Sequence, residues 1–401
     1  MGCCATKCCV TKCCATKCCA TTSYSRETLE FADKSSCSET LVFADKKYDF
    51  RIPALLYVKE WKTFLAFAEK RTSTNDADAT NLMMSKGTRH SGSLQWSPTE
   101  DLMKAAKDGY RTMNPCPVFE RISKTLFLFF ICIDINTPEG KLKPGQTRLC
   151  YVTSTDCGET WSGLTDLTSS VNFTNYQTFA VGPGHGIQLS SGPLLVPAYV
   201  KVYSGKSVKP HSVVLRSEDL NTWKAGQPIG VESGECQLAE VSDREGRRQV
   251  YLNARSTGKL RVEALSVDGG ERFTLLNQLT LKERPPGCQG SVLGFPAREL
   301  PAGEGGSSET ELPAGGGGSS ETALLFSHPT GPDRLDLGVY LRKSLQDHDY
   351  WSKPLIIHPG PSGYSDLTCC EEEGHFGCLM ECGKGEVSKR LQIAFREFDL
   401  K

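Results

Sequence analysis

The sequence predicts an all-β protein, a β-propeller whose blades are four-stranded antiparallel sheets. Three observations support this fold class: a turn motif that occurs three times, short strand-like runs between clusters of turn residues, and little room for long helices. The clearest copy of the motif, at residues 154–161, reads STDCGETW and matches the Asp box, S-x-D-x-G-x-T-W.

Each fixed residue of the Asp box has a local structural role. Asp156 lies inside a tight turn, where its carboxylate is expected to accept hydrogen bonds from the turn's own backbone N–H groups. Gly158 allows the positive φ that the turn needs, and Trp161 is expected to bury its ring against the neighbouring hairpin. The motif therefore predicts architecture rather than catalysis.

Two weaker copies of the Asp box follow. SEDLNTW at 217–223 lacks the glycine, and SVDGGERF at 266–273 has Phe in place of Trp. The copies lie about 50 to 60 residues apart, a period typical of propeller blades. The strand-like runs expected within the blades are 54–58, 64–68, 126–133, 148–153, 194–199, 212–217, 249–254 and 324–327.

Length and composition favour one large domain. With 401 residues, 38% of them hydrophobic, the chain is long enough for a single closed propeller with a sizeable core. The net charge of −1 gives no reason to expect a nucleic-acid partner. No apolar run approaches the roughly 18 residues that span a bilayer, and the longest, at 126–133, has the length of a strand.

The 19 cysteines are unevenly distributed along the chain. Eight fall in the first nineteen residues as adjacent pairs, and the other eleven are scattered. Because the N-terminus has no secretory apolar segment, we expect the scattered cysteines to be reduced and mostly buried.

Residues 1–45 are predicted to be a Cys- and Lys-rich tail with a polar tether, ahead of a propeller at 46–401. The tail repeats a unit close to ATKCC, and its start matches the myristoylation pattern M-G-x-x-x-[ST], with Gly2 as the acceptor. One acyl chain binds membranes only marginally, and S-acylation of Cys3 and Cys4 would supply the second signal for a membrane anchor. Metal binding by the paired thiols and a functionless expansion of a short DNA repeat are the alternatives. The pairs lack both C-x-x-C spacing and an accompanying His, so we predict no metal site.

A low-complexity insertion at 299–322 interrupts the late part of the propeller. It reads ELPAGEGGSSET and then ELPAGGGGSSET, a tandem repeat rich in Gly, Ser and Pro. Such a segment buries too little apolar surface to become ordered, so we predict a disordered loop between two strands.

A series of motifs resembles the exo-α-sialidases, or neuraminidases, in the order in which that family has them. The first is FRIP at 50–53, and the others are TMNPCP at 112–117, TFAVGPGH at 178–185, GECQ at 234–237, LNARS at 252–256, GCQGS at 287–291 and GYSDL at 363–367. The resemblance covers the chain from about residue 46 to its end, and it implies a six-bladed propeller.

The resemblance also implies a function. The family hydrolyses terminal sialic acid, and the tail and late insertion are most similar to the plasma-membrane, ganglioside-type branch of the vertebrate enzymes. We therefore expect hydrolysis of gangliosides and other sialoglycoconjugates, including sialoglycoproteins, without a cofactor. The expected location is peripheral, on the plasma membrane or on endosomal and lysosomal membranes, with some cytoplasmic protein.

Three arginines match the family's clamp for the substrate carboxylate: Arg51, Arg255 and Arg334. The chemistry agrees with the match, because sialic acid carries a permanent anion on its anomeric carbon. Guanidinium groups stay charged and bind carboxylate oxygens in pairs.

The resemblance assigns catalysis to Tyr364, Glu235 and Asp76. A carboxylate nucleophile would be repelled by the substrate's own carboxylate, whereas a neutral phenol would not be. Tyr titrates near 10 and needs an adjacent base, for which Glu235 is the match. Asp76 is matched as the acid that protonates the leaving oxygen and then activates water, which implies a retaining reaction. Asp78 is the alternative acid in the same loop.

Secondary contacts follow from the same resemblance. Met113 and Asn114 are expected near the acetamido group, Ile52, Glu69 and Arg71 beside the clamp, Glu139 and Tyr199 near the glycerol side chain, and Gln289 at the floor. Lys201 stands where the family's cytosolic branch has a second Tyr.

Three other functions compete: a soluble sialidase of broad specificity, a non-catalytic sialic-acid-binding propeller, and an interaction scaffold. The presence of all three catalytic matches favours an enzyme.

Overall fold

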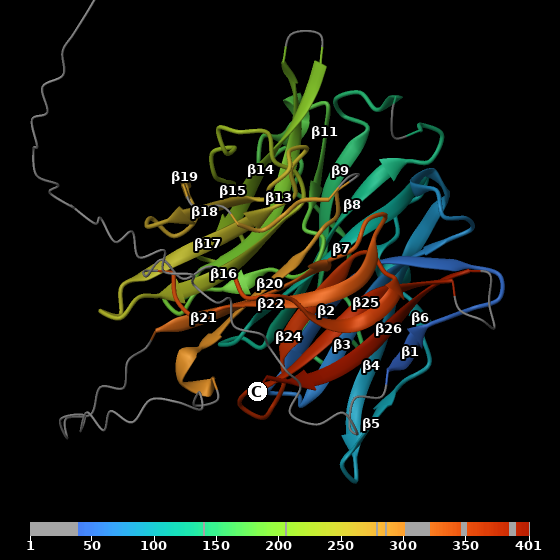
Figure 1. The fold of residues 1–401 in the computed structure, drawn as a ribbon. Coiled ribbons are helices and arrows are strands. Elements are labelled where there is room, and N and C mark those ends of the chain that lie inside the picture. The colour runs from blue at the N-terminus through green and yellow to red at the C-terminus, as the bar shows by residue number, and fades with distance from the viewer. Residues whose placement is uncertain are drawn as a thin grey trace, which may run out of the picture.

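The computed structural model describes residues 39–138, 141–204, 207–277, 280–284, 287–300, 321–345, 351–384 and 390–400. They form six antiparallel sheets, which are the six blades of a propeller (Figure 1). Four blades have four strands, and two carry a short fifth strand. The all-β propeller predicted from the sequence is therefore confirmed.

The first three blades contain the strands up to β15. Blade 1 is β2 (Asp49–Val58), β3 (Thr63–Arg71), β4 (Ala79–His90) and β5 (Ser93–Trp96), with β6 (Glu100–Asp101) beside β4. Blade 2 is β7 (Tyr110–Glu120), β8 (Thr125–Asp134), β9 (Thr147–Ser154) and β10 (Thr165–Asp166). Blade 3 is β11 (Thr178–Val181), β13 (Leu194–Ser204), β14 (Ser207–Ser217) and β15 (Lys224–Ala225), with β12 (Ile187–Gln188) beside β13.

The remaining three blades close the ring. Blade 4 is β16 (Cys236–Ser242), β17 (Arg248–Ala254), β18 (Val262–Ser266) and β19 (Thr274–Leu275). Blade 5 is β20 (Ser291–Pro296), β21 (Thr322–Pro329), β22 (Leu335–Arg342) and β23 (Leu355–Pro361). Blade 6 is β24 (Ser365–Cys369), β25 (His375–Lys384), β26 (Leu391–Asp399) and β1 (Thr40–Phe43).

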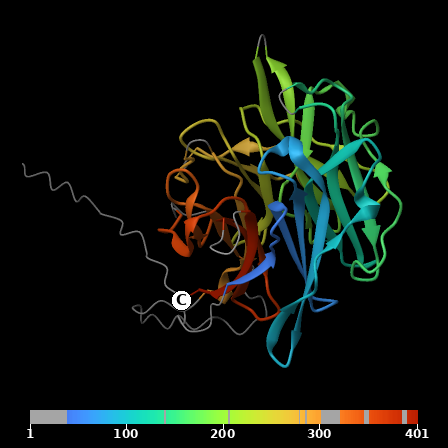
Figure 2. The ribbon, with the colours of Figure 1, turned by 90° about the vertical axis from the view of Figure 1, so that its right-hand side faces the viewer.

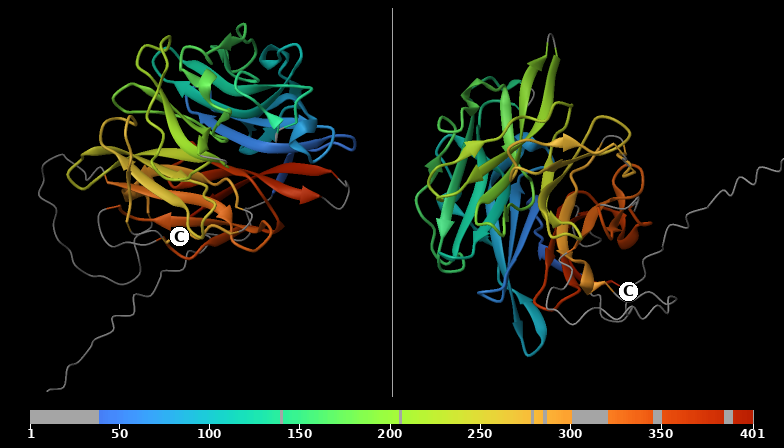
Figure 3. Two further views of the ribbon diagram at one scale, coloured as in Figure 1. Left: turned by 90° about the horizontal axis from the view of Figure 1, so that it is seen from above. Right: turned by 90° about the vertical axis from the view of Figure 1, so that its left-hand side faces the viewer.

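The first strands of the blades lie around the centre of the ring. β2 contacts both β7 and β24, β16 contacts β20, and β20 contacts β24. Seen from above in Figure 3, the last blade lies against the first, red beside blue. A ring of this kind leaves few exposed sheet edges, which protects a large all-β protein from edge-to-edge pairing.

Blade 6 is completed by the N-terminal strand. β1 pairs antiparallel with β26, with Thr40 opposite Phe395, and Figure 2 shows the blue strand beside the red ones. The tether predicted up to residue 45 is therefore too long, because residues 40–43 belong to the propeller. Phe43 is fully buried, and packing of this side chain outweighs the polar composition of its neighbours. Gly2, Cys3 and Cys4 lie outside the described residues.

The hydrophobic core lies between neighbouring blades. Between blades 2 and 3, for example, Phe127 and Phe129 of β8 pack against Trp223, with the Phe129 and Trp223 rings 4.7 Å apart. Each run that was predicted as a strand lies within a strand of the structure. The longest apolar run lies in β8, and nearly all of β8 is buried. The second repeat of the insertion ends at Thr322, which already belongs to β21, and residues 301–320 lie outside the described ranges.

The Asp boxes connect the third and fourth strands of blades 2, 3 and 4. In the first box, Thr160 N donates to Asp156 Oδ1 at 2.9 Å, and Gly158 N donates to Ser154 Oγ at 2.9 Å. Cys157 and Gly158 have φ of +62° and +78°, whereas in the second box, which lacks the glycine and is one residue shorter, Leu220 at the position of Cys157 has φ +66°. The shorter turn still keeps the hydrogen bond from the Thr backbone to the Asp carboxylate, because Thr222 N donates to Asp219 Oδ1 at 2.6 Å.

The two ends of the propeller have different roles. Strands alternate in direction, so the start of each first strand, the end of each second strand and the start of each third strand share one rim, called here the upper rim. The Asp boxes follow third strands and lie at the opposite rim. In Figure 1 the β13–β14 hairpin projects at the top and the β4–β5 hairpin at the bottom. Helical structure in the described residues is limited to short 3-10 turns, and no helix there is long enough to cross a bilayer.

Candidate active site

A cavity of about 230 Å³ opens at the upper rim, and all six blades contribute to its wall. Its lining comprises Arg51, Ile52, Arg71, Asp76, Met113, Asn114, Ile131, Ile133, Thr178, Phe179, Tyr199, Lys201, Glu235, Arg255, Arg334 and Tyr364. We call it the catalytic cavity. The residues matched to the arginine clamp and to catalysis, far apart in sequence, all line it.

Tyr364 and Glu235 form a direct hydrogen bond. Tyr364 lies immediately before β24, and its hydroxyl donates to Glu235 Oε1. Arg255 Nη1 donates to the other oxygen of Glu235 at 2.8 Å and to Tyr364 Oη at 3.1 Å. The phenol oxygen thus has a proton acceptor on one side and a fixed positive charge on the other.

The other two matched arginines flank the Tyr364 ring. The guanidinium carbons of Arg51 and Arg334 lie 5.4 and 5.3 Å from the ring centroid. Arg334 Nη2 donates to the Gly287 carbonyl at 3.1 Å. Together with Arg255 these side chains place three permanent positive charges in the catalytic cavity, an arrangement suited to a carboxylate.

Glu381, on β25, holds two parts of this site together. Its Oε1 accepts hydrogen bonds from Arg51 Nε and from the Ile52 backbone N–H, both at 3.1 Å. Its Oε2 accepts one from the Tyr364 backbone N–H at 3.2 Å. Sequence reasoning missed Glu381, because a single Glu within an apolar strand has no local motif to signal it.

Asp76 lies across the cavity in a short 3-10 turn, Asp76–Asp78, after β3. Arg71 Nη1 donates to Asp76 Oδ1 at 2.6 Å, and Arg51 Nη1 is 3.6 Å from the same oxygen. Arg71 is held in turn by Glu69, whose Oε1 also accepts the Asn114 backbone N–H at 2.7 Å. The Asp76 side chain is half exposed, so it can reach a ligand at the cavity mouth. Asp78 instead hydrogen-bonds Ser73 and does not line the cavity.

The charges of the site follow from burial and neighbours. Burial, and then the Glu235 carboxylate, raise the pKa of Tyr364 well above its ordinary value, so the phenol is neutral. Burial raises the pKa of Asp76, but Arg71 outweighs it, and the pKa of Asp76 lies below its ordinary value. Burial lowers the pKa of Arg51, but its acidic neighbours, first Glu381, raise it above the ordinary value and keep the group charged.

Three residues that line the cavity have left-handed backbones. Ile52, Asn114 and Arg334 have φ of +59°, +57° and +59°, and none of them is glycine. The first two sit at irregularities in the pairing of β2 with β3 and of β7 with β8. Non-glycine residues in this region are strained, and the surrounding packing must hold them. Such bulges re-aim side chains, here those of Arg51 and Met113.

A buried polar layer supports the site from below. Asp366 is fully buried and accepts hydrogen bonds from the Leu55 backbone N–H at 2.7 Å and from Ser291 Oγ at 2.7 Å. His185 Nδ1 lies 2.8 Å from the same carboxylate. Sequence reasoning gave neither Asp366 nor His185 a role, although both fall within quoted motifs.

Two predicted contacts belong to this support rather than to the wall. Gln289 does not line the cavity: its Nε2 donates to the Ser365 carbonyl at 3.0 Å, and its Oε1 accepts the Ser365 N–H at 3.1 Å. Glu69 is likewise fully buried and orients Arg71. Both were expected to bind substrate, but packing places them behind their neighbours. Glu139 lies outside the described residues.

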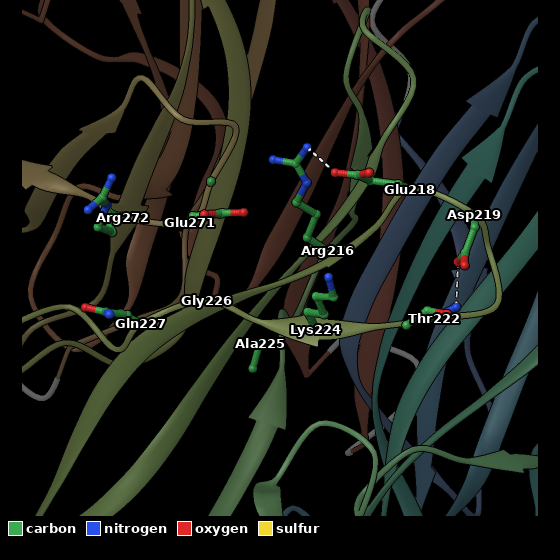
Figure 4. A pocket seen from close by; sticks show the side chains of 11 residues that line it. Arg216, Glu218, Asp219, Thr222, Lys224, Ala225, Gly226, Gln227, Glu271 and Arg272 are labelled. Atoms are coloured by element: carbon green, nitrogen blue, oxygen red, sulfur yellow. Dashed lines mark hydrogen bonds and ion pairs between the residues drawn. The ribbon is translucent and has the colours of Figure 1, made fainter.

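A larger cavity lies elsewhere. It measures about 730 Å³ and lies beside the second and third Asp boxes, between blades 3 and 4 (Figure 4). Arg216 and Glu218 form an ion pair in its wall at 2.9 Å. It contains none of the matched residues, so volume alone does not identify the reactive site.

The described residues include one group that could hold a metal ion, although the sequence predicted none. Cys370, His375 and Glu397 of blade 6 offer ligand atoms within 4.8 Å of one another. Arg89 already pairs with Glu397, and His375 Nδ1 with Asp399 at 2.5 Å. The group lies at the opposite rim and has no part in the catalytic cavity.

Comparisons with known proteins agree with this geometry. Residues 62–378 match the family described as BNR repeat-like domain. Sialidase-3 of Bos taurus is 44% identical over 384 residues, 87% of this chain and 89% of that protein. Sialidase-3 of Homo sapiens is 43% identical, covering 88% and 90%, and Sialidase-2 of Mus musculus is 40% identical, covering 90% and 95%.

Solved structures share the fold at lower identity. The Hadza microbial sialidase Hz136 has a TM-score of 0.71 at 21% identity, covering 90% of this chain and 68% of that chain. A Trypanosoma rangeli sialidase in complex with 2,3-difluorosialic acid, described as a covalent intermediate, has a TM-score of 0.66 at 17% identity, covering 92% and 59%.

Proposed function

This chain belongs to the sialidase family and is a glycoside hydrolase that releases terminal sialic acid, and we propose that Tyr364 is its nucleophile and that gangliosides are its preferred substrates. The observation that carries the proposal is the hydrogen bond from Tyr364 to Glu235 beneath three arginines. No other described cavity combines a nucleophile, a base and a clamp for an anion.

In the first half-reaction the substrate carboxylate binds Arg51, Arg255 and Arg334. This contact brings the anomeric carbon over Tyr364 Oη. As the phenol attacks, its proton passes to Glu235, while Arg255 stabilises the charge that develops on the phenol oxygen. The bond from the anomeric carbon to the leaving oxygen breaks, and that oxygen takes the proton of Asp76.

In the second half-reaction water replaces the leaving group. Asp76, now a carboxylate, removes a proton from the water as its oxygen bonds to the anomeric carbon. The bond to Tyr364 breaks, and Glu235 returns the proton to the phenol oxygen. Two inversions at one carbon give net retention.

Substrate binding itself prepares Asp76 for its role as an acid. In the free site the positive charges of Arg71, Arg51 and Arg334 hold the pKa of Asp76 down despite its burial. A bound carboxylate offsets part of this positive charge and covers Asp76 from water. Both effects raise its pKa, so the carboxyl is protonated in the complex that needs it.

The preference for gangliosides draws support from the tail and from the resemblance of the tail and late insertion to the ganglioside-type branch of the family. The myristoylation pattern at Gly2, with Cys3 and Cys4 beside it, favours a protein held at a membrane surface. An enzyme held there meets glycolipid at high effective concentration, whereas soluble oligosaccharide gains nothing from tethering.

Three measurements test the proposal. Hydrolysis of a fluorogenic α-sialoside between pH 4 and 7, followed by comparison of a ganglioside in vesicles with sialyl-lactose, tests activity and preference. Proton NMR of the first-formed sugar anomer tests retention; the inverted anomer would exclude the covalent route. Membrane fractionation of Gly2→Ala tests the anchor, and unchanged membrane association would exclude myristoylation. Sialic-acid binding without turnover would identify a lectin instead.

A further inference from the structure

A second cavity adjoins the catalytic one. It measures about 280 Å³ and is lined by Tyr199, Lys201, Pro210, Glu232, Ser233, Gly234, Glu235, Arg255, Ser256 and Thr257. We call it the side cavity. Tyr199, Lys201, Glu235 and Arg255 line both cavities, so the two are contiguous. The side cavity is no smaller than the catalytic one, which leaves room for a group beyond the sugar itself.

Backbone hydrogen bonds hold the wall of the side cavity. Ser233 N, in the segment before β16, donates to the Pro210 carbonyl of β14 at 2.9 Å, and Gly234 N donates to the Arg255 carbonyl at 2.8 Å. Thr257 Oγ1 donates to Glu232 Oε1 at 3.0 Å. These contacts make the cavity a feature of the ligand-free protein, so a ligand need not open it.

The position of the side cavity, together with the proposed function, decides which part of a substrate would enter it. Asp76, the proposed acid, belongs to blade 1, and the leaving group therefore departs on that side. The side cavity lies between blades 3 and 4, across the ring and beyond Glu235. The group that points there belongs to the sialic acid itself, on the side of Tyr199, where the three-carbon glycerol side chain is expected.

The charges of the side cavity are balanced except at one residue. Glu232 pairs with Lys209 at 3.3 Å, and Glu235 pairs with Arg255 at 2.8 Å. Lys201 is half-buried on β13, and no described residue forms an ion pair with it. An ammonium group in this position attracts an anion more strongly than it would in bulk water.

We propose that the side cavity is a subsite for substituents on the glycerol side chain of sialic acid, and that Lys201 makes it favour substituents with a negative charge. The protein would then accept sialic acids modified at the end of this side chain. An anionic modification would be preferred over a neutral one of equal size.

Matched probes test the subsite. Three fluorogenic α-sialosides are needed: one unmodified, one with a succinyl amide at C9 that ends in a carboxylate, and one with the same chain ending in a carboxamide. For the wild-type protein we expect kcat/KM to favour the carboxylate probe over the carboxamide probe by about five- to tenfold at low salt, with the ratio falling as salt screens the charge. The ratio should fall to about one in Lys201→Gln.

Lys224→Gln, on the outer strand of the same blade, is the matched control and should keep the wild-type ratio. Rejection of both C9 probes, a wild-type ratio near one, or an unchanged ratio in Lys201→Gln would overturn the subsite. Loss of turnover with all three probes would instead count against the proposed function. In that case calorimetry with 2,3-didehydro sialic acids that carry the same two C9 chains, and that bind without turnover, decides the subsite. The ratio of their dissociation constants then replaces the ratio of kcat/KM.

Discussion

At the scale of single residues, the chemistry depends on how one phenol is surrounded. Burial and the Glu235 carboxylate keep Tyr364 protonated, and in the proposed mechanism Arg255 stabilises the phenol oxygen once the proton leaves. Arg51 and Arg334 lie beside the Tyr364 ring, so the proposed clamp and the proposed nucleophile share one small volume. On this proposal, recognition of the carboxylate is coupled to attack on the adjacent carbon.

Removing the phenol oxygen should stop turnover but not binding. Tyr364→Phe deletes the attacking atom and leaves the three arginines in place, so we expect kcat to fall about a thousandfold or more. The dissociation constant of a 2,3-didehydro sialic acid should change by less than about tenfold. Stopped assays and calorimetry on the same preparation separate the two effects. Near-normal kcat in this variant would remove Tyr364 from the mechanism.

The proposed role of Asp76 as the acid predicts that the rate depends on the leaving group. Asp76→Asn should slow cleavage of sialyl-lactose by about a hundredfold or more, because a sugar alkoxide leaves poorly without a proton. An activated aryl leaving group needs little help, so its first step should be much less affected. The ratio of kcat/KM for the two substrates is the measurement. Asp78→Asn is the matched control, and a change of the same ratio there would reassign the acid.

At the scale of elements, the Asp-box turns depend on ionised carboxylates. Hydrogen bonds from Thr160 lower the pKa of Asp156 to about 2, and the pKa of Asp268 also falls to about 2, there by backbone and Ser266 hydrogen bonds that outweigh burial. A group whose folded pKa is depressed contributes stability above its unfolded pKa of about 3.9 and loses it as pH falls towards the folded value.

Asp156→Ala should therefore lower the melting temperature at pH 7. The difference from wild type should shrink between about pH 4 and pH 2, because the wild-type carboxylate becomes protonated there. Asp108→Ala, at an exposed position, serves as the control and should have little effect at either pH. A melting difference that stays constant down to pH 2 would show that the carboxylate charge does not stabilise the turn.

The strand that closes blade 6 gives a second test at this scale. Phe43 is fully buried, whereas Leu41 of the same strand is 51% exposed. Phe43→Ala should destabilise the protein by about 3 to 5 kcal/mol, and Leu41→Ala by about 0.5 kcal/mol or less. Chemical denaturation measures both. Equal losses in the two variants would mean that β1 does not close the propeller core.

At the scale of the whole molecule, local motifs predicted the fold and most of the catalytic wall. Arg51, Arg255 and Tyr364 each lie in a short motif of the family, so the resemblance could assign them to one site, and the structure places each of them near a strand end at one rim. Glu381 could not be predicted in this way, since its partners Arg51 and Ile52 lie more than 300 residues away. Gln289 and Glu69 were expected to contact substrate, but both are buried behind the residues that line the cavity, and burial depends on packing that no motif encodes.

The domain boundary failed for a related physical reason. A four-residue strand with two exposed positions has too little pattern to distinguish it from a tether, and only its pairing with β26 makes it part of the fold. The side cavity likewise forms where two blades meet. The sequence therefore showed that Lys201 replaces a Tyr, but it could not show that Lys201 has no ion-pair partner among the described residues.

The central claim is that Tyr364 forms the covalent bond to sialic acid. The most direct test is to treat the protein with 2,3-difluorosialic acid, which slows release of the glycosyl group, and to locate the added mass by peptide mapping. We predict one adduct per chain, on the peptide that contains Tyr364, and none in Tyr364→Phe. An adduct on Glu235 or Asp76, or the same adduct in the Phe variant, would contradict the claim.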